Sequence, residues 1–253
     1  MKTALLSELL KLRIFMPLAL IAVGAGPAVA VIICATLPVT QNSGLADLSA
    51  ENIVSASALG LDACAVATIV LASVAVGSEF STGQITQSLW LTPRRRTLFG
   101  AKLGSVGIIS IGITIVALAG TSVVAAIALA IGGHDPFAVV AGNSIRTLFG
   151  SALMPVFYGL VAACAAMVFR STGGAIMTAL TLVLVAGITP WFGDRVAEAL
   201  APVSPSAAIH SVAGLASHVE ELGALGGTVT LVCWIVAASV IAVTLFARRD
   251  GGS

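Results

Sequence analysis

The 253-residue sequence is 58% hydrophobic and only 9% charged, with a net charge of +1 and a mean hydropathy of +1.09. A soluble globular domain carries about 25% charged residues, so this chain has too few charges to form a polar shell. Its long unbroken apolar runs also exclude the alternating pattern of an outer-membrane barrel. The composition therefore predicts an all-α, polytopic membrane protein built from apolar helices of roughly 20 residues each.

The N-terminal segment 1–13 predicts an amphipathic helix at the inner membrane interface. Its leucines share one helical face, whereas its polar residues fall elsewhere; those leucines are Leu5, Leu6, Leu9 and Leu12. The first 30 residues also resemble a secretory signal peptide. Because the apolar run continues through Cys34, we expect an uncleaved first helix.

Six apolar segments follow and predict six spans within one transmembrane domain, 1–253. The predicted spans are 14–35, 57–77, 101–131, 147–169, 172–191 and 228–246. The third is long enough to tilt or to project from the membrane. The loop 192–227 contains Pro202 and Pro205 and is expected to form short outer helices.

Basic residues favour one side of this predicted topology. The other side carries only Arg146 and Arg195, together with most of the acidic residues. The positive-inside rule then places both termini in the cytoplasm, and we expect the chain in the cell membrane. The basic residues assigned to the cytoplasmic side are Lys2, Lys11, Arg13, Arg94, Arg95, Arg96, Lys102, Arg170, Arg248 and Arg249.

Several kinds of chemistry lack their motifs in this sequence. There is no G-x-x-x-x-G-K-[ST] phosphate loop, so we expect no ATP hydrolysis by this chain alone. The histidines have no metal-ligand spacing, and we expect neither a metal, a cofactor nor a nucleic-acid partner. The cysteines all fall in apolar runs and are expected to be small core side chains: Cys34, Cys64, Cys164 and Cys233.

Asp62 is the one clear charge within a predicted span. A carboxylate inside the membrane indicates a functional site by default. Two structural roles compete with that interpretation, namely reach to the outer interface or pairing with Arg146 at the start of the fourth span. We favour the structural roles, because a proton-coupled transporter usually needs a relay of such groups in its core.

The segment 79–96 is the longest predicted cytoplasmic stretch. Ser81 or Thr82 could cap a short helix that Pro93 ends, and Ile85 and Leu89 would share one face. Such a helix, with an apolar edge and a basic exit, could dock on a partner protein. It could equally lie on lipid with its arginines on anionic headgroups.

Four stretches together resemble the ABC-2 type permeases, which are six-span exporter subunits. Ser7–Arg13 is similar to the S-E-x-x-K-L-R lead before the first span of that family. Glu79–Ile85, followed by a Pro-Arg-Arg and an Ala-Lys pair, is similar to its E-[FY]-x-x-G-T-I … P-x-R … A-K stretch, with Gln84 where the family usually has Thr. Phe169–Ser171 and Phe246–Asp250 resemble its basic turn and its R-R-D ending.

The resemblance implies that the segment after the second span is a coupling helix seated on a separate ATP-binding cassette ATPase. That partner would hold ATP and Mg, and a second copy of the permease or a sister permease would complete the transporter in the bilayer. The residues that the resemblance assigns to ATPase contact are Glu79, Phe80, Gly83, Ile85, Leu89, Pro93, Arg94 and Arg95. Glu79 would fix the hinge before the helix. The alternatives are an ion-coupled secondary transporter that uses Asp62, and a non-catalytic membrane scaffold or intramembrane enzyme.

Overall fold

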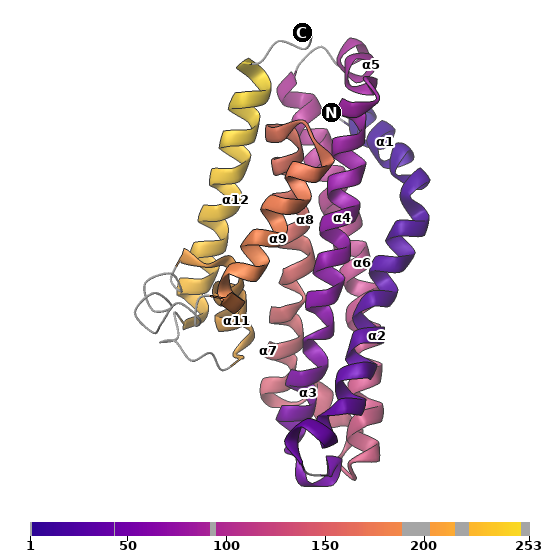
Figure 1. The fold of residues 1–253 in the computed structure, drawn as a ribbon, viewed down its shortest axis with the longest axis vertical. Coiled ribbons are helices and arrows are strands. Elements are labelled where there is room, and N and C mark those ends of the chain that lie inside the picture. Colours follow the sequence, from indigo (N-terminus) through magenta and orange to yellow (C-terminus); the bar gives the residue numbers. More distant parts are fainter. Residues whose placement is uncertain (1, 43, 92–94, 189–202, 216–222, 249–253) are drawn as a thin grey trace.

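A computed structural model describes residues 2–42, 44–91, 95–188, 203–215 and 223–248. These residues form α-helices joined by short 3-10 helices and turns, with no β-strand among them. The helices run mostly along one long axis, as Figure 1 shows, with the first helix, Lys2–Lys11, and the end of the last helix, Gly223–Arg248, near the same end of the bundle. This arrangement confirms the predicted all-α architecture.

Five helical segments among the described residues are long and apolar enough to cross a membrane: Leu5–Gln41, Ala50–Ser81, Arg96–Ile131, Gly142–Phe169 and Gly223–Phe246. The predicted fifth span, 172–191, begins as α9 (Thr172–Ile188), whose apolar stretch Thr172–Val185 is shorter than the other five. Residues 189–191 lie outside the described part. Six crossings and their orientation therefore stay a prediction.

Two predicted spans are each divided between the end of a short helix and the longer helix that follows it. α3 (Ala50–Ala58) leads into α4 (Gly60–Ser81), and α7 (Gly142–Ser151) leads into α8 (Leu153–Phe169). The hydroxyl of Ser49 caps α3 by accepting a hydrogen bond from the backbone N–H of Asn52 at 3.3 Å. The long helices α2 (Met16–Gln41) and α6 (Arg95–Ile131) extend past the predicted spans.

The helices α4 and α8 form the centre of the bundle, and both are mostly buried. Their apolar side chains join those of α6, α9, α11 (Pro205–Ala213) and α12 (Gly223–Arg248) in the main core cluster. Tyr158 is the largest fully buried side chain. Gly159 lets α8 approach α6 closely, since a Cβ on Gly159 would lie 2.7 Å from the Ser110 hydroxyl of α6.

The helices α2 and α12 flank the bundle on opposite sides (Figure 1) and expose many large apolar side chains. Such surfaces are suited to lipid rather than to water. α2 holds to α4 at a glycine pair, because a Cβ on Gly60 would collide with the carbonyl oxygen of Gly26. Small residues at helix contacts are typical of membrane bundles, where close approach replaces the hydrophobic effect.

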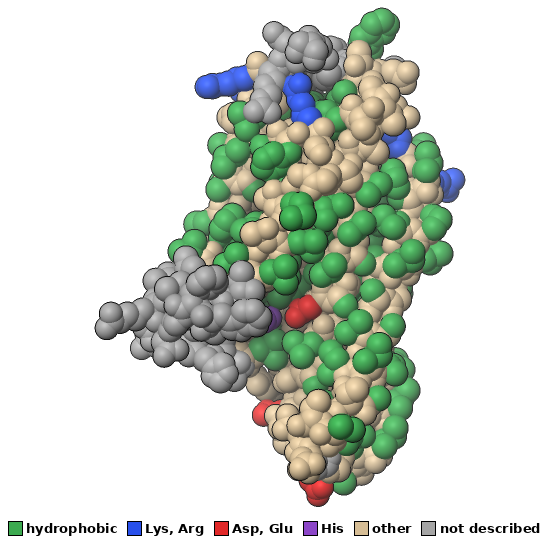
Figure 2. Space-filling model, in the orientation of Figure 1, with side chains coloured by type: hydrophobic (Ala, Val, Ile, Leu, Met, Phe, Trp, Pro, Cys, Tyr) green, Lys and Arg blue, Asp and Glu red, His purple; other side chains and the backbone are tan. Residues whose placement is uncertain are grey.

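Charged side chains are unevenly distributed along the molecule. Figure 2 shows Lys and Arg gathered toward the upper end of one face, whereas Asp and Glu lie near the middle and at the opposite end. Hydrophobic side chains cover most of the surface between them. The upper end is the one that carries α1 (Lys2–Lys11) and α5 (Gln84–Leu91) in Figure 1, and it is called the basic end below.

Candidate functional site

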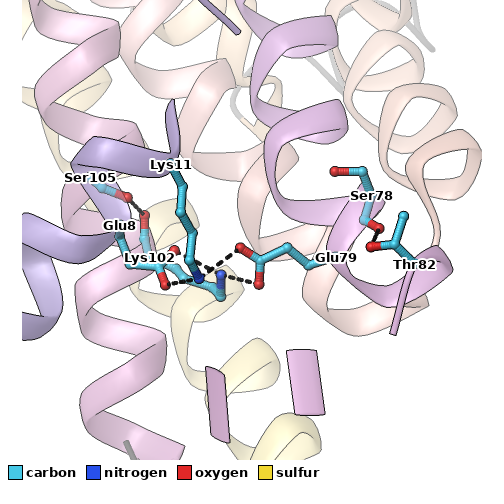
Figure 3. A network of polar contacts seen from close by, with 7 residues as sticks. All are labelled: Glu8, Lys11, Ser78, Glu79, Thr82, Lys102 and Ser105. Atoms are coloured by element: carbon cyan, nitrogen blue, oxygen red, sulfur yellow. Dashed lines mark hydrogen bonds and ion pairs between the residues drawn. The ribbon is translucent and has the colours of Figure 1, made fainter. Parts of the chain in front are cut away.

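Three helices bring four charged side chains together at the basic end. Glu8 and Lys11 come from α1, Glu79 from the last turn of α4, and Lys102 from the start of α6. Figure 3 shows their carboxylate and ammonium groups meeting in one place, next to the turn that leads into α5. These four residues are called the four-charge cluster.

The ion pairs within the cluster form a closed ring. Lys102 Nζ lies 2.8 Å from Glu8 Oε2 and 2.5 Å from Glu79 Oε2. Lys11 Nζ lies 2.8 Å from Glu8 Oε1 and 3.4 Å from Glu79 Oε1. Each lysine therefore bridges both carboxylates, and the ring as a whole carries no net charge.

Three of the four side chains in the four-charge cluster are buried. Glu8, Glu79 and Lys102 are 7%, 5% and 2% exposed, whereas the side chain of Lys11 is 37% exposed. Buried charges are tolerated when they are paired and hydrogen-bonded, and losing one partner is costly. The four-charge cluster thus holds α1, α4 and α6 together close to the start of α5.

The side of α1 that faces the bundle is mixed in character. Glu8 is buried there, whereas polar Ser7 and apolar Leu6 are both exposed. Leu5 lies over Gly104 of α6, since a Cβ on Gly104 would come within 3.3 Å of the Leu5 Cδ1 atom. The burial of Glu8 is possible because Lys102 pairs with it. The placement of this helix at the membrane interface stays a prediction.

The turn before α5 also differs in detail from the prediction. The hydroxyls of Ser81 and Thr82 both donate to the carbonyl oxygen of Ser78, at 3.0 and 2.8 Å. They therefore close the end of α4 rather than cap α5. Gly83 follows with a φ of +71°, a left-handed conformation that glycine adopts readily. This glycine lets the chain reverse direction between the two helices.

The residues expected to contact an ATPase fall into different environments. Phe80, in the last turn of α4, and Ile85 of α5 both pack against the main core cluster, so Ile85 holds α5 to the bundle. Trp90 points away from it and is 85% exposed. Pro93 and Arg94 lie outside the described residues, as do the side chains of Leu89 and Arg95.

Asp62 lies in the first turn of α4, far from the four-charge cluster. Its carboxylate has no hydrogen bond or ion pair within the described part of the chain. The expected partner Arg146 is engaged elsewhere: its guanidinium donates to the carbonyl oxygens of Ser211 and Val212 at 2.9 and 3.0 Å. The structure therefore gives no support to an Asp62–Arg146 pair.

Arg146 instead fastens the end of α11, the helix that carries His210. Burial disfavours the charged imidazolium and lowers the pKa of His210 below its usual range. His210 Nε2 has no hydrogen-bond partner within the ranges that the structure describes. His134 is placed differently, with Nε2 lying 2.8 Å from the carbonyl oxygen of Leu48. Neither histidine belongs to a metal-binding group of described residues.

Sequence reasoning singled out Glu79 but missed three of its neighbours. Glu8 and Lys11 appeared in the S-E-x-x-K-L-R lead and Lys102 in the Ala-Lys pair, but no contact of these residues with Glu79 was predicted. The available signal was charge sign: acidic and basic residues occur together at the same predicted end of three helices. Their pairing depends on tertiary contacts between residues as far as 94 positions apart.

The fold and its apolar surface give this chain the character of a multi-pass helical membrane protein. Comparison of the chain with family models, with curated proteins and with solved structures finds no match in any of the three. A more specific function therefore has to be argued from the site itself.

Proposed function

We propose that this chain is the membrane-spanning permease subunit of an ATP-driven ABC-2 type exporter. It would span the cell membrane six times with both termini in the cytoplasm and work as a permease dimer with separate ATP-binding subunits. The observation that carries the proposal is the position of α5. This short helix lies at the basic end, next to the four-charge cluster, and exposes Trp90.

The contacts around α5 would allow force to pass from a partner into the bundle. Ile85 joins α5 to the core, and Glu79 joins the end of α4 to α1 and α6 through its two lysine partners. A push on α5 would therefore move three helices together rather than bend one loop. ATP and Mg would be bound by the partner subunit, which supplies the energy.

Trp90 provides the sharpest test of ATPase docking. A large aromatic side chain in an interface often contributes 2 kcal/mol or more, which is about 30-fold in affinity. We expect Trp90→Ala to reduce the amount of co-purifying ATP-binding subunit by at least about tenfold. Phe137→Ala is the matched control, since Phe137 is 77% exposed in η3 (Pro136–Val140), close to the opposite end of α6.

The experiment is a pull-down of the tagged chain from its native membranes in mild detergent, with ATPase activity measured on the eluate. Co-purification that survives Phe137→Ala and is lost in Trp90→Ala would support the proposal. A chain that binds no ATPase in any detergent, or that binds it equally well in both variants, would contradict it.

An ion-coupled secondary transporter is the second candidate, and Asp62 is the observation that favours it. An intramembrane carboxylate without a described partner is suited to bind a proton or a cation. This candidate predicts that transport by the purified chain in vesicles follows an imposed ion gradient without ATP and stops in Asp62→Asn. Transport that requires ATP and persists in Asp62→Asn would exclude it.

A further inference from the structure

Two hollows of opposite chemistry meet beside α1. The first, of about 280 Å³, surrounds the four-charge cluster and also presents the hydroxyl-bearing residues Ser78 and Ser105. The second, of about 340 Å³, runs between α2 and α6 and is lined almost wholly by apolar side chains. Leu12 and Phe15 line both, so the charged hollow and the apolar groove lie side by side.

We infer that these adjacent hollows bind one phospholipid of the surrounding membrane, with its phosphate at Lys11 and an acyl chain in the α2–α6 groove. The side chain of Lys11 is 37% exposed, whereas that of Lys102 is 3% exposed, so Lys11 is the ammonium that a ligand can reach. Arg13, two residues further on, is also exposed. Cationic side chains at the end of a membrane-spanning helix attract the phosphate of a lipid headgroup.

The groove has the shape and chemistry of an acyl-chain site. Its volume falls within the range of ligand pockets, and its rim carries apolar side chains that are open to the outside, including Met16, Leu20 and Ile108. A water-soluble ligand would leave these side chains without contact, whereas a lipid tail would cover them. The ligand therefore needs both a phosphate and a long apolar chain.

Gly112 offers a clean way to close the groove. It lines the groove, and a Cβ added there meets nothing within 4 Å. Gly112→Trp should fill the space without displacing the backbone. Gly24 of α2 gives a matched control, because a Cβ there also meets nothing within 4 Å and Gly24 lines neither hollow.

The test combines these variants with three probes added to delipidated protein in detergent. The probes are dioleoyl phosphatidylglycerol, dioleoylglycerol and glycerol phosphate, which separate the whole ligand from its tails and its headgroup. Thermal unfolding is followed for each, and the phospholipid retained per chain is counted by mass spectrometry. This inference does not depend on the proposed transport function, and the measurements need no ATPase partner.

We expect phosphatidylglycerol to raise the unfolding midpoint of the wild type and of Gly24→Trp, with about one phospholipid retained per chain. Gly112→Trp should retain none and show no shift, while dioleoylglycerol and glycerol phosphate should each have little effect on any variant. An equal shift in Gly112→Trp would overturn the inference, as would a shift with dioleoylglycerol as large as that with the phospholipid.

Discussion

Removing the ammonium of Lys102 should destabilise the protein more than any other single charge change at the basic end. Its Nζ atom bridges Glu8 and Glu79 at 2.8 and 2.5 Å, and its side chain is only 3% exposed. Lys102→Met preserves the aliphatic stem but leaves two buried carboxylates with one shared ammonium. Breaking a buried pair in this way costs about 3–5 kcal/mol.

Lys11→Met is the matched comparison, because Lys11 contacts the same two carboxylates. Its side chain is 37% exposed, so solvent screening reduces the expected loss to about 1 kcal/mol or less. The free energy of unfolding of both variants can be measured in mixed micelles by circular dichroism. A second measurement on Glu79→Gln/Lys102→Met should show partial recovery, since one unpaired carboxylate is then removed. An equal decrease in the free energy of unfolding of the two lysine variants would refute the assignment of Lys102 as the buried lysine of the four-charge cluster.

Three further predictions concern the rest of the bundle. Arg146→Gln removes two charged hydrogen bonds to the end of α11 and should lower the free energy of unfolding by about 1–2 kcal/mol. Limited proteolysis near that helix should become faster, and unchanged cleavage would contradict this. Gly60→Val should prevent folding, since its Cβ would collide with the carbonyl of Gly26, whereas Gly24→Val should be tolerated; the yield of monodisperse protein on size exclusion distinguishes the two. Burial lowers the folded-state pKa of His210, so the unfolded chain binds more protons at low pH. The contribution of neutral His210 to the free energy of unfolding should therefore be complete above about pH 6.5 and be lost as the pH falls through the lowered folded-state pKa. His210→Gln should flatten the dependence of the unfolding free energy on pH, and an unchanged slope would count against it.

The helical class and most of the spans could be predicted, because an apolar run of about 20 residues has few alternatives in lipid. The breaks between helices could not. α3 and α4 divide at Leu59, between Ala58 and Gly60, where the sequence stays apolar and has no proline. The division coincides with the close contact of Gly60 with α2, and such a contact between distant residues is not visible in the local sequence.

The candidate site could be predicted only in part. The short helix after α4 was expected from a capping Ser81 or Thr82, a proline and an apolar i, i+4 pair, and α5 lies there. The sequence did not predict which apolar side chains of α5 face outward: Ile85 lies against the core, whereas Trp90 is exposed. A partner surface and a core contact use the same residue types, so burial alone separates them.

The length of α6 has a mechanical consequence. The helix carries buried Lys102 near one end and buried Leu129 near the other, and its 37 residues extend about 55 Å without interruption. Lys102 belongs to the four-charge ring, whereas Leu129 belongs to a separate apolar cluster with Ile53 of α3. A continuous helix packed at both ends moves as a rigid unit. If a partner shifts α5, α6 would therefore carry the displacement along its length, from the four-charge cluster to the apolar cluster around Leu129.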